Sequence, residues 1–96
     1  MFVKIHNSGN TEILAVSDED LIGKKFKQGN LYIEVSESFY KDKRVDKKQL
    51  EDLLLHFDNI NIIGKQSIEI ALKINIIQKE NIIFIKGIPH AQIFAI

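Results

Sequence analysis

Apolar and polar residues alternate over residues 2–5, and this alternation leads into residues 7–10, which read Asn-Ser-Gly-Asn. A period of two is typical of a half-buried β-strand, and a run of Asn, Ser and Gly favours a turn. Residues 13–16 are apolar again and indicate a second, more buried strand. The chain is therefore predicted to begin with a β-hairpin.

The next third of the chain combines short polar turns with short strands. Residues 17–22 predict a capped helical turn that ends at Gly23. Residues 24–27 predict an edge strand protected by lysines, and a turn over 28–30 leads to an alternating strand over 31–35. The residues of this strand expected to face the core are Leu31, Ile33 and Val35.

The strongest helix signal covers residues 47–57. Asp46 is a good N-cap residue, and Gln49 lies at the position that completes a reciprocal capping box. The apolar residues of this segment form one helical stripe, consisting of Leu50, Leu53, Leu54 and Phe57.

A second helix is predicted over residues 65–74, with apolar residues on more than one side. Asn75 is suited to the left-handed position that follows a helix, and Ile76 can fold back onto the last turn. Such a helix is expected to be deeply buried or covered by a partner.

The last segment predicts two further strands. Residues 82–85 form a continuous apolar run that indicates a buried strand, residues 86–90 contain a Gly and a Pro that interrupt it, and residues 91–96 predict a final strand within the sheet. We therefore expect one α+β domain over residues 1–96. Its sheet would have about five strands, mostly antiparallel or mixed, with two helices on one face.

Composition narrows the classes of function. The 96 residues carry 13 basic and 13 acidic side chains, so the formal net charge is zero, which argues against a protein that mainly coats nucleic acid. The chain has no cysteine, which excludes disulfides, zinc–cysteine sites and thiol catalysis. No apolar run is long enough for a membrane span and the first residues lack a signal-peptide pattern, so we expect a cytoplasmic protein with no cofactor.

Five ordered stretches give the sequence a family resemblance. They are Asp20-Leu21-Ile22-Gly23-Lys24, Ser36-Glu37-Ser38-Phe39-Tyr40, Asn61-Ile62-Ile63-Gly64, the apolar residues 68–72, and Gly87-Ile88-Pro89-His90-Ala91-Gln92. Together they resemble an archaeal family catalogued as domain of unknown function 424. The resemblance implies an archaeal cytoplasmic origin and a compact αβ domain, but no established activity, cofactor or catalytic residue. The departure from the family is Asn75, where a glycine is expected.

His90 is the first candidate for function. It follows Pro89 in the predicted turn, and Gln92 lies two residues further along, which in a strand is the same face. The imidazole and the amide can together bind a ligand or RNA, or His90 can act as a general base. The alternative is structural: both side chains satisfy backbone and neighbouring groups in a turn.

Two lysine-rich stretches contain aromatic residues, which is the combination that single-stranded RNA requires. The first is Lys24, Lys25, Phe26 and Lys27, and the second is Phe39, Tyr40, Lys41, Lys43, Arg44, Lys47 and Lys48. The alternative interpretation is a solvated surface whose charge is damped by Asp42 and Asp46.

Asn61, Gly64 and Lys65 lie at the start of the second predicted helix, where either a bound phosphate or a simple Asn cap fits the sequence. The acidic residues 18–20 could bind a cation or could stabilise a helix start. The three histidines lack metal-site spacing, and no metal is expected.

Three functions remain open. The first is a non-catalytic module that binds RNA or a ribosomal particle, with His90, Gln92 and the basic stretches as its surface. The second is a small-molecule binder or enzyme that uses His90, Gln92, Tyr40 and Lys24 in a pocket. The third is a protein-interaction adaptor or a homodimer, with no membrane association in any of the three.

Overall fold

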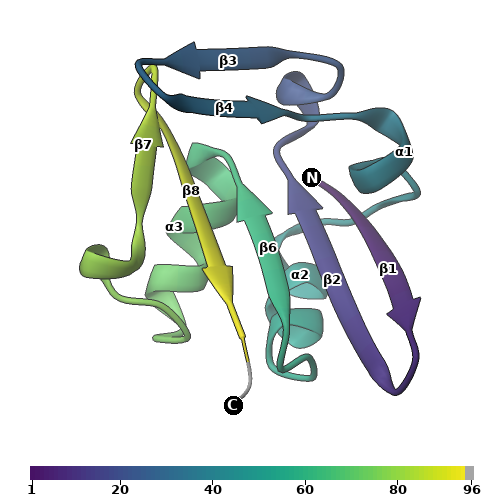
Figure 1. Cartoon of the computed structure of the whole chain (residues 1–96). Helices are drawn as coiled ribbons and strands as arrows, with labels where there is room; N and C mark the ends of the chain where they lie inside the picture. The colour runs from purple at the N-terminus through teal and green to yellow at the C-terminus, as the bar shows by residue number, and fades with distance from the viewer. Residues whose placement is uncertain (95–96) are drawn as a thin grey trace.

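The computed structural model describes residues 1–94, and Figure 1 shows how its elements follow one another. The strands are β1 (Phe2–Ser8), β2 (Thr11–Ser17), β3 (Lys25–Gln28), β4 (Leu31–Glu34), β5 (Lys43–Arg44), β6 (Ile60–Ile63), β7 (Ile83–Ile85) and β8 (Ile88–Ile93). The α-helices are α1 (Glu37–Tyr40), α2 (Lys47–Leu54) and α3 (Lys65–Lys73). Two short 3₁₀ turns, η1 (Glu19–Leu21) and η2 (Lys79–Asn81), complete the fold.

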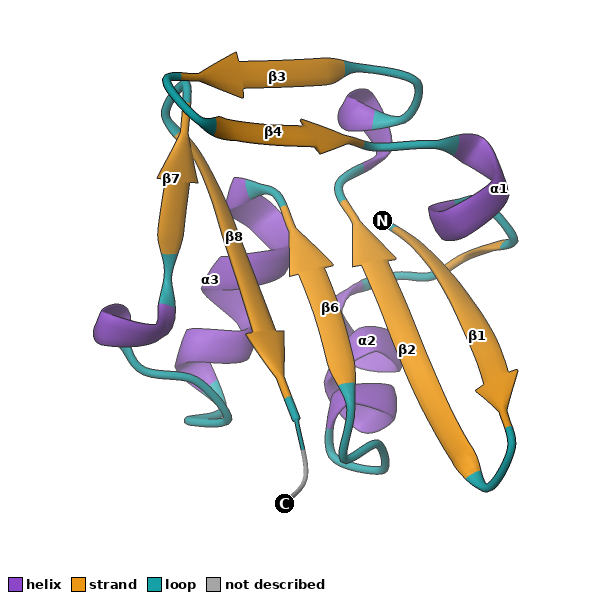
Figure 2. Ribbon diagram, viewed as in Figure 1, coloured by secondary structure: helices purple, strands orange, loops and turns teal. Residues whose placement is uncertain are grey.

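Six strands form one mixed sheet in the order β5-β1-β2-β6-β8-β7, and β3 pairs with β4 in a separate hairpin. Neighbouring strands of the large sheet are antiparallel except β2 and β6, which are parallel. Figure 2 looks onto the sheet face that α2 and α3 do not cover, and the β3–β4 hairpin crosses the ends of the strands. The predicted α+β class and the two helices on one face are confirmed, while the sheet is larger than the five strands expected.

The main core lies between the sheet and its two covering helices. Alternate residues of the central strands face α2 and α3 because a strand turns every second side chain to the same side. Leu14, Val16 and Ile62 are fully buried there, and Leu50 and Leu54 meet them from α2. Burial of each such side chain contributes about 1.5–3 kcal/mol, so this layer holds α2 and α3 in place.

A smaller core lies on the opposite face of the sheet, under the β3–β4 hairpin and α1. Its buried members are Ala15, Leu21, Val35, Tyr40 and Ile63. This second core covers one end of that face and leaves the remainder of the strands accessible (Figure 2). We call the face that α2 and α3 do not cover the open face.

The predicted helix signals are confirmed in their details. Asp46 and Gln49 form the reciprocal capping box at the start of α2, although α2 ends at Leu54 and does not reach Phe57. Asn75 adopts the left-handed conformation, with a φ angle of 62°. The backbone bonds from Ile76 N to Ala71 O and from Asn75 N to Leu72 O form a Schellman motif.

The structure differs from the strand predictions at several places. Strand β6 was not predicted, because four mostly apolar residues between two helices carry no alternation that identifies a strand. The run predicted as a buried strand over 82–85 is the edge strand β7, in which Ile83 and Phe84 are more than half exposed. Leu31, expected to face the core, is also exposed.

Pro89 does not interrupt the sheet but lies inside β8. Its carbonyl accepts a hydrogen bond from Gly64 N, at the point where β6 ends and α3 begins. In an antiparallel strand the N–H and C=O groups of one residue point to the same side, so the N–H group that Pro89 lacks would face the end of β6. Pro89 therefore removes no hydrogen bond from the sheet ladder. The predicted final strand over 91–96 lies partly outside the described residues, within which β8 ends at Ile93.

Candidate functional site

The open face carries a row of polar side chains on the neighbouring strands β6 and β8. Asn61 on β6 lies directly opposite Gln92 on β8, and His90 lies two residues before Gln92. These three residues point away from α2 and α3 because their strand neighbours Ile62 and Ala91 belong to the helix-side core. We call Asn61, His90 and Gln92, with Tyr40 from α1, the polar row.

Hydrogen bonds fix the orientation of the polar row. The hydroxyl of Tyr40 donates to Oδ1 of Asn61 at 2.8 Å, and Nε2 of His90 lies 3.0 Å from the same oxygen. Because Oδ1 can only accept, His90 must donate through a protonated Nε2, and in the neutral ring its Nδ1 is then an acceptor. The amide of Asn61 is therefore held with its oxygen toward Tyr40 and His90.

The groups of the polar row that are not used internally face solvent. Neither Nδ2 of Asn61 nor Nδ1 of His90 has a hydrogen-bond partner among the described residues. Every buried side-chain nitrogen or oxygen atom of the described residues has such a partner, so these two nitrogens are not buried. Gln92 is exposed. The open face thus presents a donor from Asn61, an acceptor from His90, and both kinds of group from Gln92.

Burial keeps the two titratable members of the polar row neutral near pH 7. It raises the pKa of the Tyr40 hydroxyl to about 12 and lowers the pKa of the His90 imidazole, because the charged form of each is poorly solvated there. A tyrosine with a raised pKa is a weaker acid, and a histidine with a lowered pKa is a weaker base. The polar row is therefore better suited to binding a neutral polar group than to transferring protons.

The two lysine-rich stretches lie in different places. Lys24, Lys25 and Lys27 belong to the segment leading into and forming β3, whose hairpin contacts β7, and Gln28 of this hairpin accepts a 2.6 Å hydrogen bond from Lys86 N. This first stretch is therefore close to the turn that precedes His90.

The second stretch is at the opposite edge of the sheet. Arg44 on β5 pairs with Glu19 and lies 5.2 Å from the centre of the Phe2 ring. Lys43, its neighbour in β5, lines a hollow beside α2. Three strands separate β5 from β8, so Lys43 and Arg44 lie at the opposite edge of the sheet from His90.

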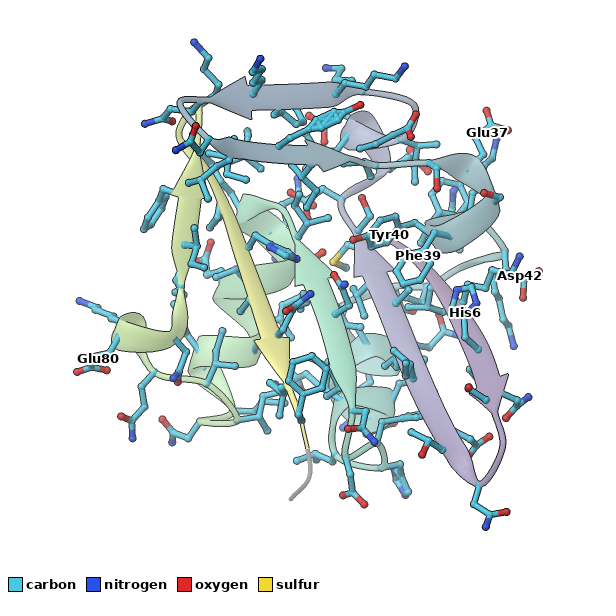
Figure 3. The ribbon with its side chains drawn as sticks, viewed as in Figure 1. His6, Glu37, Phe39, Tyr40, Asp42 and Glu80 are labelled. Atoms are coloured by element: carbon cyan, nitrogen blue, oxygen red, sulfur yellow. The ribbon has the colours of Figure 1, made fainter. Side chains whose placement is uncertain are left out.

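His6 is a residue of the open face that the sequence did not single out. Its ring stacks on Phe39 with centroids 4.4 Å apart, and its Nε2 lies 2.8 Å from the Phe39 carbonyl oxygen. Figure 3 shows His6, Phe39 and Tyr40 close together beside β1 and β2. The alternation of β1 was the available signal, because it places His6 on the same face as Lys4, away from the apolar Val3 and Ile5.

The predicted phosphate site at the start of α3 is filled by the protein itself. Asp18 accepts hydrogen bonds from Gln66 N at 3.0 Å, Ser67 N at 2.8 Å and Ser67 Oγ at 2.7 Å. Asn61, proposed as the cap, binds Tyr40 and His90 instead. The buried Asp18 carboxylate thus occupies the position at this helix end where a bound anion would lie. For Asp18, this replaces the two roles considered for residues 18–20, which were to bind a cation or to stabilise the start of their own helical turn.

Pro89 and the surface hollows lie apart from the polar row. Pro89 is buried and lines an apolar hollow of about 270 Å³ on the helix side with Ile68 and Phe84. Three other hollows, of about 370, 490 and 200 Å³, are lined by residues outside the polar row. Among residues 1–94, no group of three or more His, Asp or Glu side chains is placed to hold a metal ion. No helix in this range is long and apolar enough to cross a membrane.

Comparison with known proteins gives two matches. The profile of a family described as "Protein of unknown function (DUF424)" matches residues 6–96. A crystal structure of an uncharacterized conserved protein from Methanopyrus kandleri is similar in fold, with a TM-score of 0.77 and 26% sequence identity over 96% of this chain and 88% of that one. No curated protein gives a significant match.

Proposed function

Because the chain belongs to the DUF424 family of proteins of unknown function, we propose a function from its own residues: it is a non-catalytic module that binds single-stranded RNA, alone or in a ribosomal particle. The observation that carries the proposal is the fixed orientation of the polar row. Tyr40 and His90 hold the Asn61 amide so that a donor, an acceptor and the Gln92 amide face outward together.

The groups of the polar row match the needs of base recognition. An unpaired base presents neighbouring donors and acceptors on its edges, and proteins read these edges with amide and imidazole side chains. Asn61 and Gln92 lie opposite each other on adjacent strands, so their side chains are about 5 Å apart at Cβ and can contact one base. Neutral His90 avoids a charge that such an edge would not satisfy.

The first lysine-rich stretch supplies the complementary charge. Lys24, Lys25 and Lys27 lie in or next to the β3–β4 hairpin, which contacts β7 beside the polar row. Phosphate contacts of this kind supply affinity that depends on salt, while base contacts supply specificity. A few local lysines are compatible with zero net charge if the RNA segment is short. The proposal places the protein in the cytoplasm of an archaeal cell.

A catalytic role is less well supported by the same geometry. Within residues 1–94, His90 and Tyr40 share an amide oxygen and neither is hydrogen-bonded to a carboxylate. Burial raises the pKa of Tyr40 and lowers that of His90, which makes the first a weaker acid and the second a weaker base. The small-molecule alternative also needs a pocket around His90, Gln92, Tyr40 and Lys24, and the four hollows described above are lined by other residues. We therefore favour binding over chemistry.

The proposal is tested by fluorescence anisotropy with labelled single-stranded RNA homopolymers of about ten nucleotides. Gln92→Ala is expected to weaken binding about tenfold, because one base contact is lost without a change in the core. Lys24→Glu with Lys27→Glu is expected to weaken binding and to reduce its dependence on salt.

Lys47→Glu with Lys48→Glu is the matched control for the charge reversal. These exposed residues begin α2, on the other side of the sheet. The introduced glutamates are compatible with the fold there, because negative charge is favourable at the N-terminus of a helix. This control should bind RNA like the unmodified protein. Failure of every homopolymer to bind, or equal loss in the control and the β3 variant, would show that the open face is not an RNA surface.

A further inference from the structure

The edge of the large sheet is only partly closed by β5. Strand β5 pairs with Phe2 and Val3, and Val45 N donates to Met1 O at 2.9 Å just beyond it. Backbone N–H and C=O groups point to opposite edges of a strand at successive residues. Those of Met1 and Val3 point toward β5, so those of Ile5 and Asn7 point outward along the same edge. Within residues 1–94, the outward N–H and C=O groups of Ile5 and Asn7 have no partner strand.

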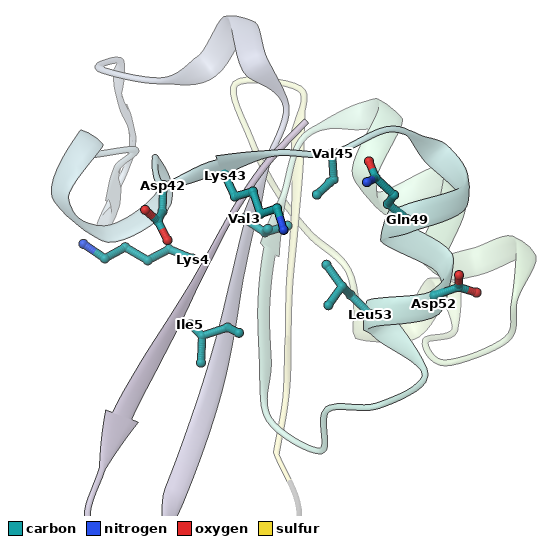
Figure 4. Close-up of a pocket in the computed structure, with 9 residues that line it drawn as sticks. All are labelled: Val3, Lys4, Ile5, Asp42, Lys43, Val45, Gln49, Asp52 and Leu53. Atoms are coloured by element: carbon teal, nitrogen blue, oxygen red, sulfur yellow. The ribbon is translucent and has the colours of Figure 1, made fainter.

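A hollow of about 370 Å³ adjoins this edge, on the face of β1 that α2 covers. Figure 4 shows its apolar side chains, Val3, Ile5, Val45 and Leu53, between β1 and α2. Ile5 is 44% exposed although it is apolar. An unpaired strand edge and an apolar hollow therefore lie side by side.

We propose that this edge binds an extended peptide segment of a partner protein, which adds to β1 as a strand in line with β5. Strand addition would satisfy the two N–H and two C=O groups of Ile5 and Asn7. A residue placed opposite Ile5 has its side chain on the same face as Ile5, which directs it into the hollow. The apolar lining selects an aliphatic side chain at that position.

The charged side chains around the hollow balance one another, since Lys4, Lys43, Asp42 and Asp52 all line it. In Figure 4 the ammonium group of Lys43 points over Val3 toward the hollow, and Lys43 has no ion pair among the described residues. Asp42, the residue before Lys43 in the chain, lies at the same end of the edge, and Asp52 lies on the α2 side of the hollow. The charges therefore set no preference for an acidic or a basic residue, and the preference of the hollow comes from its apolar lining.

A second copy of this chain fits the edge poorly. Symmetric antiparallel pairing centred on Ile5 would place Asn7 of one copy opposite Val3 of the other, where β5 already lies. Pairing centred on His6 would place Asn7 opposite Ile5 and direct a polar amide into the apolar hollow. The edge and the hollow together therefore favour a different protein with an aliphatic residue.

The test begins with selection from a displayed library of random peptides of about six residues, a common strand length, against the full chain. A selected peptide is then synthesised and titrated into ¹⁵N-labelled protein. We expect the selected peptides to share an aliphatic residue. We also expect slower amide hydrogen exchange at Ile5 and Asn7, and shifts at Leu53.

Two matched pairs of variants make the result specific. Asn7→Pro removes one outward N–H group without a loss to the β1–β2 ladder and should weaken the peptide about tenfold, while Asn7→Ala should not. Ile5→Lys should abolish binding, while Ile83→Lys, at a similarly exposed strand position on β7, should leave it unchanged.

Three results would overturn the proposal: selected peptides that shift residues outside β1, β5 and α2, unchanged binding to Asn7→Pro, or failure to select any peptide. A dimer in sedimentation analysis that Asn7→Pro dissociates would also overturn it, since the occupant would then be a second copy. Loss of RNA binding would not affect this test, because the polar row is on the other face of the sheet.

Discussion

Removal of the Asp18 carboxylate is expected to destabilise the whole fold, although Asp18 is far from α3 in the sequence. Asp18 follows β2, and its two oxygens accept three hydrogen bonds from Gln66 and Ser67 in the first turn of α3. Asp18 is 5% exposed and Ser67 is fully buried. In Asp18→Ala these donors lose their acceptor in a place that water reaches poorly.

The size of the effect follows from the number of donors. Loss of a helix cap costs about 0.5–2 kcal/mol, and each buried donor left without an acceptor costs about 1–3 kcal/mol. The Ser67 hydroxyl can rotate and the space left by the carboxylate can admit water, so we expect a total loss of about 3 kcal/mol. For a domain of this size, that loss lowers Tm by roughly 12–24 °C.

The assay is urea unfolding followed by circular dichroism, with Asp20→Ala as the control. Asp20 is an exposed acidic residue in the neighbouring 3₁₀ turn, so the control removes the same group without these contacts. The control should change the free energy of unfolding by less than about 0.5 kcal/mol. A loss below about 1 kcal/mol in Asp18→Ala would refute the view that the carboxylate holds α3 to β2.

Three further predictions concern the polar row and one helix end. Because burial raises the pKa of Tyr40 to about 12 from an ordinary value of 10.0, its contribution to stability should be complete below pH 10 and lost as pH rises toward 12; absorbance titration of Tyr32→Phe, in which Tyr40 is the remaining tyrosine, checks this. The lowered pKa of His90 means that its contribution is present above pH 6.5 and is lost as pH falls below that value; His90→Gln should flatten this part of the unfolding profile, and an unchanged profile would contradict it. Asn75→Gly should stabilise the protein by up to about 1 kcal/mol and Asn75→Ala should destabilise it, since the φ angle of 62° suits glycine best; thermal unfolding of both variants decides the sign.

Local signals in the sequence predicted the local parts of the fold. The capping box of Asp46 and Gln49 and the left-handed Asn75 each depend on residues within one helical turn, so their pattern is readable from the chain. The first hairpin was predicted for the same reason, because the turn signal in Asn7-Ser8-Gly9-Asn10 lies where two directly pairing strands meet, with Gly9 and Asn10 as the turn itself.

Long-range contacts were beyond the reach of the same signals. Asp18 caps a helix that begins 47 residues later in the chain, and nothing near Asp18 indicates this partner. Gly64 has a φ angle of 114°, and a Cβ atom at that position would lie 2.2 Å from the Asp18 side chain. Residue 64 must therefore be a glycine as long as the Asp18 side chain caps α3. Such pairs can be found only once the strand order is known.

The candidate site was predicted in part. His90 and Gln92 were predicted to share one face, and Tyr40 was considered with them, whereas Asn61 was predicted only as a cap or phosphate residue at the start of α3. That these residues form one network depends on the pairing of β6 with β8, and β6 was not predicted. Lys43 and Arg44 were grouped with them because both are basic, but adjacent residues of a strand face opposite sides, and β5 lies at the far edge of the sheet.

The most direct test of an RNA surface on the open face is a ¹H–¹⁵N correlation spectrum of the protein with and without the best-binding RNA homopolymer. Side-chain amide groups give their own signals, so Asn61 and Gln92 can be followed individually. We predict that RNA shifts these two side-chain signals and the backbone signal of His90, while those of α2 stay in place. Unmoved signals from Asn61 and Gln92 at saturating RNA, or shifts confined to α2 and α3, would contradict an RNA surface at the polar row.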